Sequence, residues 1–381
     1  MTASLALFAV AAAGLVLLAA EGVALRRQLA PAPPRPSRPA ALSVLKPLRG
    51  VDDDLEANLA SFAALDWPDY EVLLGLHDEG DPAAVVARAA AARWPGVFRV
   101  VIQRRELGLN PKVNQLDTLV AEARHELLVV SDSNVRVSPG YLAEIAARLE
   151  DPQVGLVTHL IAGVGESNAG ALLENLHLVG GIAPGIAAAK RIARRDVVMG
   201  KSMALRRADL EALGGLSPVK DVLAEDYVLG LAVPRVLGKR VEIASRPIEN
   251  VIRRRSLMQF ALRARRWSVL QRHLVGTLAY SAQAFRNPVF LAALGLAAAP
   301  SPASAGAFAA VVAARVALDA AAGRALRPPG FRVRDLWAVP VKDLVLAVGW
   351  VEGFFGKTVE WRGRRLRVLP GTRLARPEAS G

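Results

Sequence analysis

Cysteine is absent from this chain of 381 residues. Disulfide frameworks, thiolate nucleophiles and zinc sites built from thiolates are therefore excluded. Histidine occurs only five times, at spacings that match no metal-binding pattern, and 40 of the 48 basic residues are arginine. Acidic residues are missing from Asn250 to Leu318.

The composition indicates a membrane protein. Hydrophobic residues make up 52% of the chain, and the formal net charge is +13. The length suffices for one large α/β domain with about a hundred residues to spare, and that surplus is apolar. Because many arginines lie beside apolar segments, the positive charge favours an anionic membrane surface and a phosphate-bearing substrate over nucleic acid.

The first 25 residues predict a transmembrane anchor. Residues 3–25 carry no charge apart from Glu21 and are almost wholly apolar. A cleaved signal peptide is the alternative, but no Lys or Arg precedes Arg26, as a signal peptide would require. The positive-inside rule then places the chain after Arg26 in the cytoplasm, at the inner membrane. Residues 26–40 contain five prolines and predict a stiff linker.

Residues 41–250 alternate between strand-like and helical patterns. The strand-like runs cover 42–45, 70–76, 98–102, 127–130, 154–160, 197–205 and 240–245, and the helical patterns lie near 53–65, 82–93, 112–124, 167–180 and 224–237. This rhythm predicts an α/β catalytic domain with a mainly parallel sheet between helices. Ligands of such sheets bind beyond the carboxyl ends of the strands, where Lys46, Asp78, Asp81 and Asp132 are expected.

The segment after residue 250 is expected to associate with the membrane. Residues 251–275 mix Arg with Leu, Phe and Trp and predict an amphipathic interfacial helix. Within 276–360, two apolar stretches, Pro288 to Ala314 and Leu336 to Phe355, predict membrane helices. In an alternative arrangement, Pro300 and Pro302 split the first stretch into a re-entrant pair. Two crossings would return the basic tail, 361–381 with Arg362, Arg364, Arg365 and Arg367, to the cytoplasm.

The run from Glu126 to Asn134 ends an apolar strand in Asp132-Ser133-Asn134. Oxygen ligands at this position suit Mg²⁺ or Mn²⁺, with Asp132 and Asn134 as the candidate metal ligands. The metal would neutralise charge on a departing diphosphate. The competing interpretation is an Asx turn that caps the following helix.

Asp226 stands at the start of a helical pattern, in Ala224-Glu225-Asp226-Tyr227. A helix N-terminus keeps a carboxylate ionised, which suits a general base that takes the proton from an acceptor hydroxyl. If that hydroxyl attacks the anomeric carbon of a sugar from the face opposite the leaving group, the single displacement inverts the configuration of this carbon. Helix capping is the alternative explanation of an acidic residue at this position.

If the departing diphosphate belongs to a sugar nucleotide, two loops offer residues that could contact this substrate. Asp81 follows a strand and precedes a helix, so a nucleoside-facing role and a capping role are both open. The loop from Gly108 to Asn114 can bring Lys112 to a diphosphate, although a solvated lysine is the simpler interpretation. Gly200-Lys201-Ser202 lacks the preceding glycines of a phosphate-binding loop.

Arg263, Arg266 and Trp267 are expected on one helix, with the two arginines on one face. Guanidinium groups bind phosphate oxygens in fixed geometry, and an indole offers a flat surface to an acceptor. A basic interfacial helix with Trp at the headgroups explains the same pattern equally well.

Together these segments resemble the ceramide glucosyltransferase family, a branch of the inverting GT-A-fold glycosyltransferases in families 21 and 2. The resemblance runs from Leu42 to about Trp267. It rests on Leu45-Lys46-Pro47-Leu48-Arg49-Gly50-Val51-Asp52, Gly108 to Asn114, Asp132-Ser133-Asn134-Val135-Arg136-Val137, Gly200-Lys201-Ser202-Met203, Ala224-Glu225-Asp226-Tyr227 and Arg263-x-x-Arg266-Trp267.

The resemblance implies a role for each candidate residue. Asp81 would be the first aspartate, near the nucleotide, Asp132 the metal-binding aspartate and Asp226 the base. Arg263, Arg266 and Trp267 match the (Gln/Arg)-x-x-Arg-Trp signature near diphosphate and acceptor. Residues expected to bind the UDP-sugar are Lys46, Asp81, Lys112, Asn114 and Asp132. Asn134 departs from the family's Asp-x-Asp pattern.

The expected function is transfer of a sugar, glucose in most of the family, from a UDP-sugar to a lipid hydroxyl such as that of ceramide. A hopanoid or another lipid alcohol is an alternative acceptor. A processive polysaccharide synthase shares the aspartates and the Arg-Trp signature but needs more membrane crossings than are predicted here. The remaining alternative is a non-catalytic protein whose basic helix binds the membrane surface.

Overall fold

The computed structural model describes residues 1–327, 330–361 and 364–376. Contacts between residues divide the chain into two compact units. The sheet unit comprises Gln28–Ile161 and Arg194–Val251, and the helical unit comprises Met1–Arg27, Ala162–Ala193 and Ile252–Gly381. Arg362 of the expected basic tail lies outside the described residues.

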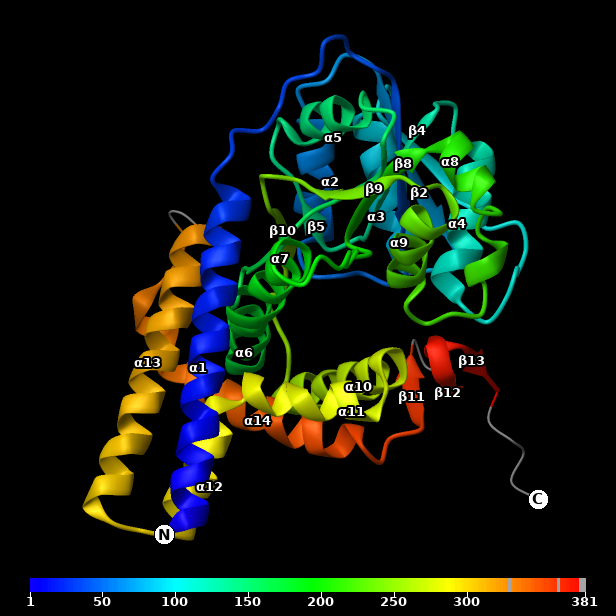
Figure 1. Ribbon diagram of the computed structural model, residues 1–381. Helices are drawn as coiled ribbons and strands as arrows, with labels where there is room; N and C mark the ends of the chain where they lie inside the picture. The colour runs from blue at the N-terminus through cyan, green and yellow to red at the C-terminus, as the bar shows by residue number, and fades with distance from the viewer. Residues whose placement is uncertain (328–329, 362–363, 377–381) are drawn as a thin grey trace, which may run out of the picture. The chain divides into compact units, whose positions relative to one another are not determined.

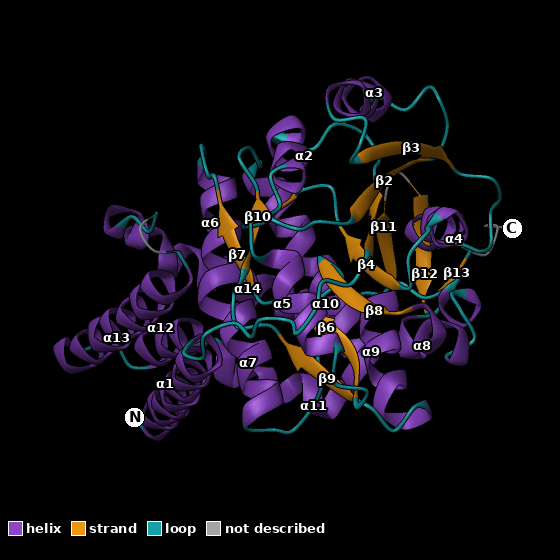
Figure 2. Cartoon of the chain, turned by 90° about the horizontal axis from the view of Figure 1, so that it is seen from above, coloured by secondary structure: helices purple, strands orange, loops and turns teal. Residues whose placement is uncertain are grey.

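A seven-stranded sheet forms the centre of the sheet unit, in the order β3-β2-β1-β4-β8-β6-β9 (Figure 2). Its strands are β1 (Leu42–Pro47), β2 (Tyr70–Leu76), β3 (Phe98–Ile102), β4 (Leu127–Ser131), β6 (Val154–Thr158), β8 (Ser202–Arg206) and β9 (Arg240–Ile243). Only β8 runs antiparallel to its neighbours β4 and β6, and the other pairs are parallel. The expected α/β class with a mixed, mainly parallel sheet is confirmed.

Helices cover this sheet because its strands are apolar on both faces. The helices of the unit are α2 (Leu55–Ala63), α3 (Ala83–Arg93), α4 (Pro111–Glu122), α5 (Tyr141–Leu149), α8 (Arg207–Ala212), α9 (Glu225–Val236) and the 3-10 turn η2 (Ser217–Val219). Side chains of α4, α8 and α9 share one buried core with β1, β4 and β8. α2 and α5 lie on the opposite face (Figure 2). A short strand pair, β5 (Val135–Arg136) with β10 (Ile248–Val251), lies beyond the turn after β4.

The strand expected over 197–205 begins only at Ser202. The amide of Ser202 donates to the carbonyl of Met199 at 3.1 Å, so the chain turns before the strand starts. Gly200 and Lys201 consequently lie in a loop at the end of β8 that adjoins the carboxyl end of its antiparallel neighbour β4. This loop brings Gly200 and Lys201 to the edge where ligands of a parallel sheet bind.

The helical unit is built mainly from long apolar helices. Its elements are α1 (Thr2–Leu29), α6 (Ala169–His177), the π-helix η1 (Leu178–Ile182), α7 (Ala183–Arg191), α10 (Leu257–Val275), α11 (Thr277–Ser281), η3 (Ala282–Arg286), α12 (Pro288–Ala298), α13 (Pro302–Leu326), η4 (Val333–Ala338) and α14 (Val339–Gly353). α1, α12 and α13 lie side by side and share an apolar core (Figure 1). β7 (Ile161–Val164) leads into α6.

Residues 162–193 pack with the helical unit, although their position in the sequence is inside the expected catalytic domain. The reason is the apolar face of α6, where Leu172, Leu173 and Leu176 meet Phe260 of α10 and Val339 of α14. Strand β11 (Thr358–Trp361) begins at the end of the segment expected as membrane helices, and the expected basic tail contains β12 (Arg364–Val368), η5 (Pro370–Thr372) and β13 (Leu374–Ala375). Both strand pairs of this small sheet are antiparallel.

Three helical segments in the described part of the chain are long and apolar enough to cross a membrane: Thr2–Leu29, Ala169–Arg191 and Pro302–Leu326. The first matches the expected anchor. The stretch from Pro288 to Ala314 divides between α12 and α13, on either side of Pro300, so the helix breaks where the re-entrant alternative places the split, while α13 continues to Leu326. The helix expected over Leu336 to Phe355 is α14, which has only 15 residues and is too short for a crossing of ordinary length.

Charged residues of α13 and α14 form one buried cluster. Arg315 Nε lies 2.8 Å from Asp343 Oδ2, and Lys342 Nζ lies 2.5 Å from Asp319 Oδ2 and 3.1 Å from Asp343 Oδ1. Arg315 also pairs with Asp319. The four charges cancel, which explains how an apolar segment tolerates them.

Candidate active site

Asp132 lies in the turn that follows β4, and two lysines bind its carboxylate. Lys112 Nζ is 3.0 Å from Oδ1, and Lys201 Nζ is 2.9 Å from Oδ2. Lys201 also donates to Asn134 Oδ1 at 2.8 Å, so Asp132 and Asn134 share one cation. Burial alone would raise the pKa of Asp132, but the two ammonium groups hold it well below its usual range.

Lys112 connects Asp132 to the first turn of α9. Its ammonium lies 2.9 Å from Glu225 Oε1 and donates to the carbonyl of Gly200 at 3.0 Å. Asn110 positions this lysine, because its side chain caps α4 by accepting hydrogen bonds from the amides of Lys112 and Val113. Burial would lower the pKa of Lys112, but Asp132 and Glu225 outweigh it and raise that pKa above the usual range.

Asp226 is held by two backbone amides. Gly200 N donates to Oδ2 at 2.5 Å, and Tyr227 N donates to Oδ1 at 2.8 Å. A side chain at position 200 would displace the carboxylate or the ammonium, because a Cβ there would lie 2.8 Å from Asp226 Oδ2 and 2.9 Å from Lys112 Nζ. Burial, followed by the charge of Glu225, raises the pKa of Asp226 to about 6, against the opposing effect of Lys112.

Lys46 holds the backbone of the turn that carries Asp132. It is fully buried at the end of β1, and its ammonium donates to the carbonyl of Asp132 at 2.7 Å and to Ser131 Oγ at 3.3 Å. It also lies 4.0 Å from the centroid of the Phe62 ring. Burial lowers the pKa of Lys46 to about 7. Lys46 therefore fixes the backbone that carries Asp132.

Asp81 and Asn114 hold loops around this centre. Asp81 Oδ1 accepts from the amides of Gly50 at 2.8 Å and Ala83 at 2.9 Å, the second of which is a helix-capping contact. Asn114 Oδ1 accepts from the amides of Leu107 and Gly108, each at 2.9 Å, and its Nδ2 donates to the carbonyl of Gly108 at 3.0 Å. The side-chain contacts of Asn114 thus close its own loop.

The structure brings together the expected residues Lys46, Lys112, Asp132, Asn134 and Asp226. Two residues of this cluster had no role in the sequence analysis. Lys201 was given no role of its own in its Gly-Lys-Ser-Met segment, and Glu225 directly precedes the expected base. The Gly-Lys-Ser-Met segment in the family resemblance was the available signal for Lys201. We call the group Lys112, Asp132, Asn134, Lys201, Glu225 and Asp226 the carboxylate–lysine cluster.

Arg263, Arg266 and Trp267 lie on α10, in the helical unit. The guanidinium carbon of Arg263 is 5.8 Å from the centroid of the Trp267 ring, as in a weak cation–π contact. Arg263 also forms an ion pair with Glu174 of α6. The helix begins with a capping box between Ser256 and Gln259.

The donor atoms of the carboxylate–lysine cluster fit a hard divalent cation. Carboxylate oxygens of Asp132 and the amide oxygen of Asn134 are ligand types that Mg²⁺ and Mn²⁺ accept. Within the described residues, no three His, Asp or Glu side chains gather as a closed metal cage. A divalent cation bound here would take Asp132 and Asn134 as its protein ligands, and a substrate's phosphates would supply others.

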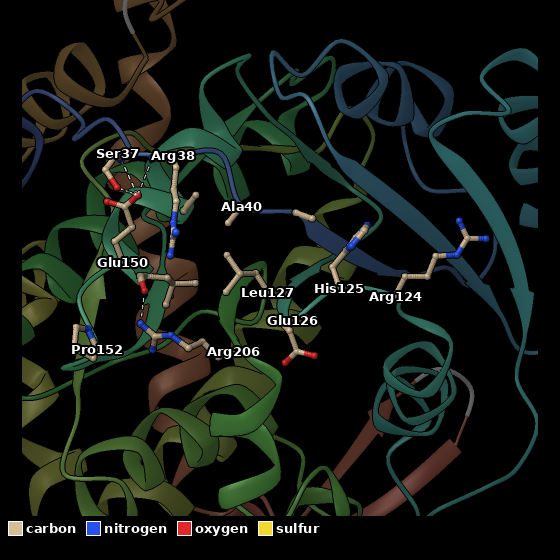
Figure 3. Close-up of a pocket in the computed structure, with 13 residues that line it drawn as sticks. Ser37, Arg38, Ala40, Arg124, His125, Glu126, Leu127, Glu150, Pro152 and Arg206 are labelled. Carbon is tan, nitrogen blue, oxygen red and sulfur yellow. Dashed lines mark hydrogen bonds between the residues drawn. The ribbon is translucent and has the colours of Figure 1, made fainter.

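A pocket of about 830 Å³ lies at the opposite edge of the sheet, at the amino ends of β1 and β4 (Figure 3). Ser37 closes one side of it, where its amide and hydroxyl donate to Glu150 Oε1 at 2.7 and 2.9 Å. Arg206, on another side, donates to the backbone carbonyls of Leu149 and Asp151. None of the expected site residues lines this pocket.

Residues 5–374 match the model of glycosyl transferase family 21, so the chain belongs to that family. The resemblance inferred from the motifs is thereby confirmed. The chain is 26% identical over 249 residues to ceramide glucosyltransferase 1 of Caenorhabditis elegans, a match that covers 62% of this chain and 51% of that protein. Ceramide glucosyltransferase 3 of the same organism is 27% identical over 233 residues, covering 60% and 50% of the two chains. The chain thus spans about half the length of these curated relatives.

Among solved structures, the chain is similar to a mannosyltransferase from Pyrobaculum calidifontis in complex with GDP-Man and Mn²⁺. The TM-score is 0.49 and the sequence identity is 21%, with 91% of this chain and 99% of that chain covered.

Proposed function

We propose that this protein transfers a hexose from a UDP-sugar to the hydroxyl group of a membrane lipid, with inversion at the anomeric carbon. The observation that carries the proposal is the carboxylate–lysine cluster, in which Lys112 bridges Asp132 to the first turn of α9, where Asp226 stands. A diphosphate leaving group needs cationic partners, and an acceptor hydroxyl needs a base. Membership of family 21 supports the same reaction.

The diphosphate is assigned to the end of β4. Asp132 and Asn134 would hold Mg²⁺ or Mn²⁺, which supplies charge neutralisation on the leaving diphosphate when bound. Lys112 and Lys201 already contact Asp132, so their ammonium groups are within one side-chain movement of the same phosphates. We assign Lys46, Asp81 and Asn114 to holding the backbone around the donor, because each has backbone groups as hydrogen-bond partners.

Asp226 is proposed as the general base. The two amides that hold its carboxylate fix its direction, and the raised pKa makes it a stronger proton acceptor than an exposed aspartate. Arg263, Arg266 and Trp267 are proposed to serve the same reaction, on the family's Arg-x-x-Arg-Trp signature. Their assignment to diphosphate and acceptor rests on that sequence match.

The acceptor is proposed to be a lipid alcohol, with ceramide preferred and a hopanoid as the alternative. The apolar helices Thr2–Leu29 and Pro302–Leu326 give the chain access to a bilayer. The relatives named ceramide glucosyltransferase support this acceptor class. The inner membrane, with the sheet unit in the cytoplasm, is the proposed location, because Arg26 and Arg27 follow the apolar run of α1.

An acceptor screen tests the proposal. Purified protein in detergent or nanodiscs is incubated with Mg²⁺ or Mn²⁺, radiolabelled UDP-glucose or another UDP-hexose, and ceramide, a hopanoid or a total lipid extract, and the products are identified by mass spectrometry. The expected product is a lipid carrying one hexose. A polymeric product would indicate a processive synthase instead. Absence of both hydrolysis and transfer with every UDP-sugar would favour a non-catalytic membrane-binding protein.

The pKa of Asp226 predicts the pH dependence of the reaction. A general base must be ionised, so kcat/KM is expected to rise through about pH 6 and to level off above it. Glu225→Gln removes a negative charge that contributes to the raised pKa, so the rise should move to lower pH. The measurement is kcat/KM for the UDP-sugar from pH 4.5 to about 8.5 in both proteins. An identical profile in the variant would argue against Asp226 as the titrating base.

A further inference from the structure

Glu174 is a buried carboxylate that the reaction proposed above does not use. It lies on α6 with 1% of its surface exposed, and it forms ion pairs with two arginines. One is Arg263 of the Arg-x-x-Arg-Trp motif, and the other is Arg255, whose Nε lies 2.9 Å from Glu174 Oε2. A buried charge of this kind persists only when its partners compensate it, so Glu174 and its arginines hold one another in place.

Backbone contacts fix the chain that enters α10 against α6. A Cβ on Gly170 would lie 2.1 Å from the carbonyl oxygen of Arg255, so only glycine permits this approach. Asn168 Oδ1 caps α6 and also accepts from the amide of Arg255 at 3.2 Å. Ser167 Oγ donates to the carbonyl of Arg253 at 2.7 Å. These contacts set the point at which α10 begins.

Apolar packing fixes the rotation of α10 about its axis. Phe260 is 1% exposed and packs in one cluster with Leu173 and Leu176 of α6. Arg263 follows Phe260 by three residues and therefore lies on the same side of the helix. That side brings Arg263 to Glu174, which lies between Leu173 and Leu176 in the sequence and about one helical turn after Gly170.

From these contacts we infer that Glu174 is a positioning residue for Arg263, and that its carboxylate sets the direction of the guanidinium before substrate binds. The inference rests on the proposed function, in which Arg263 serves the departing diphosphate. A guanidinium held in one direction stabilises developing charge without reorganising during the reaction. Without the carboxylate, Arg263 and Arg255 would repel each other and Arg263 would sample several rotamers.

A double-mutant cycle with Glu174→Gln and Arg263→Ala tests the inference. The Glu174→Gln change keeps the side-chain shape and removes the charge. We expect kcat to fall by about tenfold with KM for the UDP-sugar nearly unchanged, because positioning acts in the transition state. In the Arg263→Ala background, whose own loss is expected at about a hundredfold, Glu174→Gln should cause no further decrease.

Glu166→Gln is the matched control. Glu166 is also a buried carboxylate of the helical unit, and it pairs with Arg327 and Arg332. We expect it to lower the melting temperature about as much as Glu174→Gln while leaving kcat unchanged. If Glu174→Gln does not fold, Glu174→Asp replaces it in the cycle, since it keeps the charge but withdraws the carboxylate by one methylene group.

Two outcomes would overturn the inference: additive losses of kcat in the double variant, or a full wild-type kcat in Glu174→Gln. The same cycle read by melting temperature measures the coupling of the two residues without any substrate. If the two substitutions change the melting temperature non-additively but the protein transfers no sugar, the proposed function is rejected while the ion pair between Glu174 and Arg263 stands. An active enzyme with uncoupled residues would reject the positioning role alone.

Discussion

Asp226→Asn is expected to lower the rate of sugar transfer by about 10²–10⁴-fold, the contribution typical of a general base. The amide of asparagine fits the same space but cannot accept the proton of the acceptor hydroxyl. The amides of Gly200 and Tyr227 donate to different oxygens of Asp226, so the single carbonyl oxygen of asparagine can keep only one of these two hydrogen bonds. The measurement is the initial rate of lipid hexosylation, with binding of UDP followed separately.

Asp209→Asn is the control for this variant. Asp209 is also a buried carboxylate of the sheet unit and pairs with Arg206 at 3.0 Å and with Lys239, outside the carboxylate–lysine cluster. It should lose stability without losing transfer activity. Membrane association should be unchanged in both variants. Turnover of Asp226→Asn at the wild-type rate would remove Asp226 from the role of base.

Asp132→Asn is expected to abolish detectable transfer and to weaken binding of Mn²⁺ in the presence of UDP by at least about tenfold. The change removes the charge that attracts both Lys112 and Lys201. It also leaves these two ammonium groups without their shared carboxylate, so like-charge repulsion should spread the loop around them. Binding of Mn²⁺ is measured by electron paramagnetic resonance, and transfer is measured in the same preparations.

The readings for Asp132→Asn separate a metal role from a structural one. Asp209→Asn again serves as the comparison, because it loses a buried carboxylate that has two cationic partners but no proposed ligand. If the variant still binds Mn²⁺ but transfers no sugar, the role of Asp132 is to hold Lys112 and Lys201 and not to bind the metal. Unchanged transfer by Asp132→Asn would contradict its place in the reaction.

The α/β class was predictable because the strands of the sheet unit are continuous apolar runs separated by helical patterns. Val72, Leu73 and Leu74, for example, are all fully buried, as expected in a sheet covered on both faces. Asp132 and Asp226 were predictable as a pair of candidates because one follows a strand and the other opens a helix. Their local positions coincide with the positions where such sheets bind ligands.

The partners of these aspartates were less predictable, because pairing over long sequence distances leaves no local pattern. Lys201 meets Asp132 only because β8 runs antiparallel to β4, a reversal that apolar runs do not encode. Helix α6 looks like part of the catalytic domain in the sequence, yet its leucines pack against α10 and α14. Strand β12 contains arginines that indicated a tail in the sequence, and its pairing with β11 and β13 is not encoded in any apolar run.

The cluster of Arg315, Asp319, Lys342 and Asp343 constrains how this sequence can evolve. Losing one member strands an opposite charge away from water, at a cost of about 3–5 kcal/mol that a marginally stable fold does not tolerate. Replacing a complementary pair by apolar residues is far less harmful. Substitutions at these four positions should therefore accumulate in matched steps across related chains, so that Arg315 and Asp319 covary with Lys342 and Asp343 although more than 20 residues separate the two pairs.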